Sequence, residues 1–149
     1  MNDRLLIAID PGVSGGIAYQ DTDGGVHAMA MPDTVADLRL ALATLVCENS
    51  VAVLEDLPKF AGRMSASSMG TMFRNFGRIE GILAAFRVRV EYLRPQVWQK
   101  ALGLGDKKTH GDRWKAHLKG RAQALYPRLD VTLKTADALL ILEAAKKLL

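Results

Sequence analysis

Two short segments, at residues 4–9 and 51–54, are almost entirely apolar rather than alternating. Such runs are typical of strands buried on both faces of a sheet. Shorter strands are predicted at residues 17–19 and 26–31, and the glycine-rich turn after Pro11 indicates that the first of these pairs back on residues 4–9 as a hairpin. Residues 88–93 alternate between apolar and polar side chains, as an edge strand does. The pattern therefore predicts five strands.

Apolar residues also recur at helical spacing between and after these strands. Helices are predicted to begin after an N-cap at Asp33 or Thr34, and to span residues 69–86, 96–102, 112–125 and 135–149. The helix at 69–86 has a wide apolar stripe, which we expect first of all in the core and extending into a subunit interface. Asp112 is expected to cap the next long helix, after a basic loop at residues 103–111. The chain therefore has an α/β pattern, without internal repeats.

Carboxylates follow both buried strands, at Asp10 and at Glu55 and Asp56. Because a helix separates these strands, we expect them to be parallel neighbours whose acids meet at the edge where open α/β sheets bind ligands. Glu55 and Asp56 point to opposite faces, so only one of them joins Asp10. Asp137 is a third candidate in an almost wholly apolar segment. The structural alternatives are a turn cap at Asp10 and a favourable helix-dipole contact at Asp137.

Charge is unevenly distributed along the 149 residues, whose net charge is +4. Residues 59–121 contain 14 Lys and Arg against 4 Asp and Glu, whereas the rest contains 6 against 12. A basic middle between acidic ends favours a polyanionic partner such as nucleic acid over a merely solvated surface. The candidate DNA-binding residues are Lys59, Phe60, Arg63, Arg74, Arg78, Lys107, Lys108, Arg113 and Lys115. For Lys59, Phe60 and Arg63 the alternative is an ordinary surface loop.

Three acids beside a basic surface are typical of a site for hard divalent cations. Carboxylate oxygens suit Mg²⁺ or Mn²⁺, and two such ions about 4 Å apart promote phosphodiester hydrolysis by water. A zinc site is disfavoured, because the chain has one cysteine and its three histidines lack a convincing ligand spacing. No nucleophile elbow, Walker loop or G-x-G-x-x-G motif is present.

A single cysteine fits a reducing intracellular setting, and no signal-peptide pattern or membrane-spanning apolar run is present. We therefore expect one domain, spanning residues 1–149, without a membrane partner.

Five short motifs in order resemble the RuvC family of Holliday junction resolvases, and more closely the shorter RuvC-like proteins of phages and prophages. They are Ile9-Asp10-Pro11-Gly12, Leu54-Glu55, Phe76-Gly77-Arg78, Arg94-Pro95 with Trp98, and Ala136-Asp137-Ala138-Leu139. The resemblance implies an RNase H-like fold, which is a five-stranded mixed sheet with its first three strands antiparallel and helices on both faces. It also implies a cytoplasmic protein of bacteria, encoded by host or phage.

The resemblance further implies a homodimer that nicks opposing strands of four-way DNA with Mg²⁺, for which Mn²⁺ substitutes, at two ions per active site. Asp10, Glu55 and Asp137 match the family's metal-binding catalytic acids. Phe60 resembles the family's aromatic wedge, at a longer offset from the second acid. The helix at residues 69–86 is expected at or near the dimer interface.

Lys134 departs from the family pattern, which commonly has Asp or His three residues before the last acid. A charged lysine cannot bind a metal; it contacts the phosphate instead or lowers metal occupancy, and Asp56 or Asp130 are the candidate substitutes. Two other functions therefore remain open. One is a non-catalytic binder of branched DNA, and the other is an RNase H-like nuclease for flaps or hybrids. An actin-like phosphotransferase would need a much longer chain.

Overall fold

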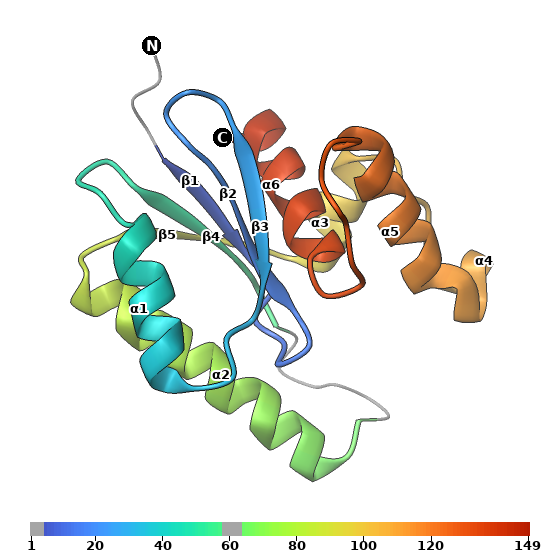
Figure 1. The fold of residues 1–149 in the computed structure, drawn as a ribbon. Coiled ribbons are helices and arrows are strands. Elements are labelled where there is room, and N and C mark those ends of the chain that lie inside the picture. The colour runs from blue at the N-terminus through green and yellow to red at the C-terminus, as the bar shows by residue number, and fades with distance from the viewer. Residues whose placement is uncertain (1–4, 58–63) are drawn as a thin grey trace.

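The computed structural model describes residues 5–57 and 64–149, in which five strands form a single mixed sheet (Figure 1). The strands are β1 (Leu6–Ile9), β2 (Gly16–Gln20), β3 (Val26–Ala30), β4 (Val51–Glu55) and β5 (Arg89–Leu93), in the spatial order β3-β2-β1-β4-β5. The first three pair antiparallel, and β4 is parallel to both β1 and β5. This topology confirms the predicted fold class, including the parallel pairing of the two apolar strands.

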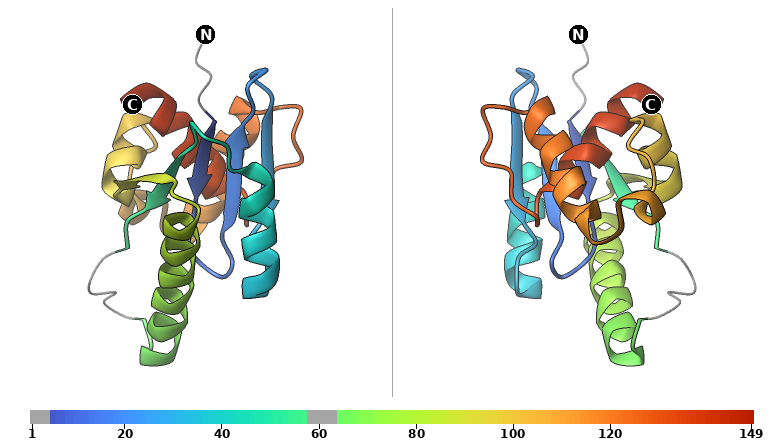
Figure 2. Two further views of the ribbon diagram at one scale, coloured as in Figure 1. Left: turned by 90° about the vertical axis from the view of Figure 1, so that its left-hand side faces the viewer. Right: turned by 90° about the vertical axis from the view of Figure 1, so that its right-hand side faces the viewer.

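Helices cover both faces of the sheet, as Figure 2 shows. Alternation along the strands separates two cores, since Ile7 and Ile9 pack on the first face while Ala8 packs on the second. On the first face lie α1 (Val35–Leu45) and α2 (Ala66–Ala85). On the second lie α3 (Pro95–Ala101), α5 (Trp114–Leu125) and α6 (Ala136–Leu148). The carboxyl end of β1 therefore lies between two helical layers.

The α6 helix is buried nearly all round, against β1 and β2 on one side and α3 and α5 on the other. Its alanines, Ala138 among them, bring it close to the sheet because they add little side-chain bulk. Gly16 makes the same approach possible next to the helix, since a Cβ there would lie 2.5 Å from the carbonyl oxygen of Lys134. The start of α6 is thus held against the first residue of β2.

The basic segment before α5 differs from the prediction of a loop. Lys107–His110 form a short helix, α4, because the Asp106 side chain accepts the backbone N–H of Thr109 and caps its N-terminus. A 3-10 turn, η1 (Gly111–Arg113), follows, and α5 begins only at Trp114. Asp112 lies inside that turn and is not the cap we predicted.

The apolar stripe at residues 69–86 is core toward its carboxyl end, as expected, and exposed toward its amino end. Ile79 and Leu83 are buried, and Phe76 and Phe86 are partly buried against the same core. Phe73 is 37% exposed. The helix also begins three residues earlier than predicted, because Ser65 caps it. Its amino-terminal half extends past the sheet, at the end where the β1–β2 turn lies (Figure 1). No sheet residues are there to cover it.

Candidate functional site

The first acid, Asp10, lies in the turn between β1 and β2, where the backbone closes tightly around it. The N–H of Asp10 donates to the carbonyl of Gly16 at 3.0 Å, and the N–H of Gly12 donates to Oδ1 of Asp10 at 3.2 Å. A Cβ on Gly15 would lie 2.7 Å from the Asp10 carboxyl carbon. Only glycine fits there, so the turn holds the carboxylate against backbone.

The second acid, Glu55, ends β4 beside Asp10. Ile9 pairs with Leu54 in the parallel ladder, so Asp10 and Glu55 are one residue further along neighbouring strands. Alternation directs both side chains to the face covered by α6, the face of Ala8. There the indole N–H of Trp98, in α3, donates to Oε2 of Glu55 at 2.7 Å.

Asp56 follows with the opposite orientation, as expected for one of the two adjacent acids. Its N–H continues the ladder to the carbonyl of Leu93 at 3.0 Å. The pKa of the Tyr92 hydroxyl on β5 is raised first by its hydrogen bond to Glu80, and the negative charge of Asp56 adds to that shift. Asp56 is therefore placed toward the β5 edge on the other face.

The third acid, Asp137, lies in the first turn of α6. It is partly buried, with Ala136 and Ala138 fully buried on either side. Because α6 packs on β1 and β2, this turn brings a carboxylate from the far end of the chain to Asp10.

Electrostatics show that the three acids act on one another. Burial and the charge of Asp10 raise the pKa of Glu55 to about 8 and that of Asp137 to about 6. Burial also raises the pKa of Asp10, against a lowering by the Gly12 N–H. The Trp98 N–H opposes the shift at Glu55. The site therefore concentrates negative charge that the protein does not fully neutralise.

Lys115 partly offsets this charge. Its ammonium lowers the pKa of both Asp10 and Asp137, and its side chain is exposed at the start of α5. We predicted Lys115 as a DNA-binding residue from the general basicity of its segment, and its charge is near enough to act on two of the acids. A phosphate approaching the site would meet this cation.

All three side chains are carboxylates, whose oxygens are the ligands that a hard divalent cation prefers. A bound cation would also relieve the repulsion among them. Within residues 5–57 and 64–149, however, no group of three or more His, Cys, Asp or Glu side chains is arranged to hold a metal ion as it stands. A bound cation would therefore have to draw these carboxylates together.

The remaining candidate residues lie on both helical layers. Arg74 and Arg78 are exposed on α2, whereas Lys107, Lys108 and Arg113 are exposed on the opposite layer, in α4 and η1. Lys134 is exposed just before α6, with its backbone against Gly16. Asp130 is exposed in the same connection. The predicted wedge and its neighbours, Lys59, Phe60 and Arg63, lie outside the described residues.

The structure also identifies two contacts that sequence reasoning missed. Trp98 was noted only as part of a motif, without a role toward Glu55. Asn75 was not noted, although a lone amide four residues before the buried Ile79 was a detectable signal. Its side chain donates to the carbonyl of Pro11 at 2.7 Å, next to Asp10.

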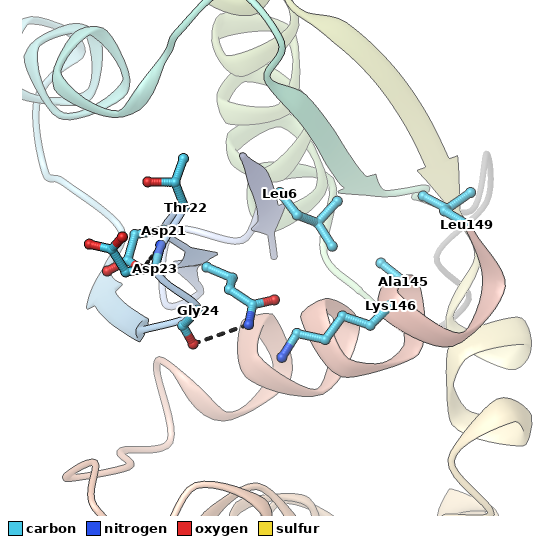
Figure 3. A pocket seen from close by; sticks show the side chains of 9 residues that line it. Leu6, Asp21, Thr22, Asp23, Gly24, Ala145, Lys146 and Leu149 are labelled. Carbon is cyan, nitrogen blue, oxygen red and sulfur yellow. Dashed lines mark hydrogen bonds between the residues drawn. The ribbon is translucent and has the colours of Figure 1, made fainter. Parts of the chain in front are cut away.

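A pocket at the opposite end of the sheet is separate from the acids (Figure 3). It is bounded by the β2–β3 turn, including Asp21 and Asp23, and by the carboxyl end of α6 with Lys146. Gln20 in its wall pairs with Leu6 at the start of β1, whereas Asp10 follows the end of β1. The candidate site is therefore the carboxylate cluster and not this pocket.

The fold is similar to solved RuvC structures of Thermus thermophilus. The RuvC bound to a Holliday junction substrate aligns with a TM-score of 0.60 and 15% identity, over 94% of this chain and 91% of that one. A second RuvC structure aligns with a TM-score of 0.52 and 16% identity, over 94% and 92%. Comparison of the sequence with family models and with curated proteins finds no match. The likeness shows the fold, which is RNase H-like as in RuvC.

Among the described residues, no helix is long and apolar enough to cross a membrane.

Proposed function

We propose that this chain is a metal-dependent endonuclease that cleaves four-way branched DNA by paired nicks as a homodimer. The observation that carries the proposal is the mutual repulsion of Asp10, Glu55 and Asp137, which come from the end of β1, from β4 and from α6. The fold adds support, because a solved protein that shares it is described in complex with a Holliday junction substrate. Mutual repulsion of buried carboxylates is a common feature of catalytic sites.

Asp10, Glu55 and Asp137 would hold Mg²⁺ or Mn²⁺, and the bound ions would activate water and stabilise the leaving oxygen during phosphodiester hydrolysis. The chain's own groups would orient these ligands. The Gly12 N–H fixes one oxygen of Asp10, and Trp98 fixes one oxygen of Glu55. The ammonium of Lys115 would attract the phosphate to the acids.

The exposed part of α2 supports the homodimer. Met64 is 40% exposed just before this helix, and Phe73 is 37% exposed in the half of the helix that extends past the sheet. Apolar side chains gathered at such a place favour a covered surface. A second copy paired through a two-fold axis would cover both stripes and present two carboxylate clusters to one four-way junction.

The test uses purified protein, a labelled four-way junction and a duplex of matching sequence, with Mg²⁺ or Mn²⁺ against EDTA. We expect paired nicks in opposing strands of the junction, only with metal, while the duplex stays intact. A flap and an RNA–DNA hybrid are assayed alongside. Faster cleavage of either would identify a nuclease of the same fold with a different substrate.

A non-catalytic binder of branched DNA is the second candidate, and Lys134 favours it. A cation stands where the RuvC family commonly places a metal ligand, and the acids do not form a ready metal site. In that case the wild type would bind junctions without nicking them, and Lys134→Asp would create metal-dependent nicking. Arg128→Asp, the same charge change on an exposed residue elsewhere, is the control.

A further inference from the structure

We propose that Asn75 is a positioning residue for Asp10, connecting α2 to the carboxylate cluster across the sheet. The inference deepens the proposed function and rests on it, because it names what holds one proposed metal ligand in place. Asn75 itself does not touch the acids. It acts through the backbone of the turn that carries Asp10.

The contact links the two helical layers, because Asp10 and Pro11 are adjacent in the chain and face opposite layers. Asp10 points to the α6 face, whereas Pro11, next in the chain, is reached from the α2 face. Asn75 Nδ2 donates to the Pro11 carbonyl oxygen at 2.7 Å, between residues 64 positions apart. Asn75 is 7% exposed and Pro11 is buried, so water does not replace the bond readily.

The two other buried polar residues among those described, Ser50 and Thr135, make only local contacts. Ser50 accepts the N–H of Cys47 at 2.8 Å, and Thr135 accepts the N–H of Thr132 at 3.0 Å, each within three residues. Asn75 differs because its partner lies in a distant turn. A buried amide on a long helix that satisfies a distant carbonyl fixes the turn relative to the helix.

The turn transmits this anchoring to the carboxylate. Pro11 is followed by Gly12, whose N–H holds Asp10 Oδ1 and whose carbonyl accepts the N–H of Gly15 at 2.8 Å. Without Asn75 the Pro11 carbonyl would be buried and unpaired, so the turn would shift to expose it. The Gly12 contact would loosen, and Asp10 would lose its fixed orientation.

The placement of Asn75 also couples the site to the surface of α2. It lies two residues after Phe73, which is exposed in the stretch of α2 that extends past the sheet. A second copy that covers this stretch would restrain the helical turn that holds Pro11. Dimerisation would therefore tighten the orientation of Asp10.

The test compares Asn75→Leu and Asn75→Asp with the wild type at pH 8. Leucine keeps the number and branching of the side-chain heavy atoms and removes the donor, and ionised aspartate keeps the shape and removes the donor. Ser50→Ala is the matched control, because it deletes another buried polar contact far from the turn. Two quantities are measured in each protein: hydrogen exchange of the Gly12 amide, and the dissociation constant for Mn²⁺ by calorimetry.

We expect Gly12 exchange at least about tenfold faster in both Asn75 variants, and Mn²⁺ affinity at least about tenfold weaker, as loss of one buried hydrogen bond would produce. Ser50→Ala should leave the Gly12 exchange rate and the Mn²⁺ affinity unchanged, even where its loss of global stability equals that of the Asn75 variants. If an Asn75 variant does not fold, the milder Asn75→Ala takes its place.

Unchanged Gly12 exchange in the folded variants would overturn the positioning role. Equal acceleration in Ser50→Ala would also overturn it, since the effect would then be general destabilisation. If Gly12 exchange responds as expected but the wild type binds no Mn²⁺, the positioning role stands and the proposed metal function fails.

Discussion

Trp98 donates its indole N–H to Oε2 of Glu55 at 2.7 Å, from α3 to the end of β4. The indole is 1% exposed, so the bond forms away from water. It commits one carboxylate oxygen of Glu55 to the protein, within range of the charges of Asp10 and Asp137. It also lowers the pKa of Glu55 against burial and the charge of Asp10.

Trp98→Phe should therefore weaken metal binding while keeping most of the packing. A hydrogen bond to a charged group contributes about 1.5–3 kcal/mol, which corresponds to a tenfold to hundredfold higher Mg²⁺ concentration for half-maximal cleavage. Titration of cleavage with Mg²⁺ measures this. Tyr126→Phe is the control, because it removes an aromatic donor to Glu143 at 2.8 Å outside the site. Equal effects of the two variants would contradict a specific role for Trp98.

Stability of the metal-free protein should fall as pH rises. The pKa of Glu55 is raised from 4.5 to about 8, so folding favours the protonated form. Its stabilising contribution is complete below pH 4.5 and is lost as the pH passes through about 8. Glu55→Gln should then be more stable than the wild type at pH 8, by at least about 1.4 kcal/mol, the equivalent of one pKa unit. Thermal unfolding in EDTA between pH 5 and pH 8 measures the difference. A wild type whose stability does not fall over this range would contradict the raised pKa of Glu55.

Neutralising any of the three acids should abolish cleavage and spare binding to the junction. Asp10→Asn, Glu55→Gln and Asp137→Asn each remove a proposed ligand, and we expect losses of about 10³-fold or more. Asp56→Asn is the matched control, since this acid points to the other face. Cleavage rates and junction affinity are measured for all four. Normal cleavage by any of the first three would show that its residue is not a ligand.

Lys115→Ala should reduce the cleavage rate by a larger factor than it reduces the affinity for DNA. The ammonium lowers the pKa of Asp10 and Asp137, so its loss leaves both more readily protonated. We expect cleavage at pH 7 to fall about tenfold, with partial recovery at higher pH. Lys119→Ala, another exposed lysine of α5, provides the comparison. Identical pH profiles for the two variants would argue that Lys115 contributes only general charge.

Binding to the junction should weaken steeply with salt, and the basic helix α4 should account for part of that dependence. Each phosphate contact contributes about 0.9 to the slope of log affinity against log salt. Lys107→Ala with Lys108→Ala should therefore flatten the slope by about two. Arg128→Ala with Lys147→Ala removes equal charge from exposed positions near the other end of the sheet. A slope unaffected by the first pair would place the DNA elsewhere.

The periodicity of the chain was enough to predict much of the site. Two continuous apolar strands separated by a helix predicted buried parallel neighbours, and the two-residue alternation of a strand then directs Asp10 and Glu55 to one face. The apolar segment around Asp137 likewise predicted a helix in the core. These are local rules, which depend only on neighbouring residues.

Contacts between distant segments were decided by the tertiary structure alone. Trp98 meets Glu55, the charge of Lys115 acts on Asp10, and Asn75 reaches Pro11 only because separate helices pack on opposite faces of the sheet. The apolar period of α2 was correctly read as a helix with a core face, but it did not show where along the helix the core ends. Periodicity identifies which face of a helix is apolar, whereas the length of the sheet beside it determines how much of that face is covered.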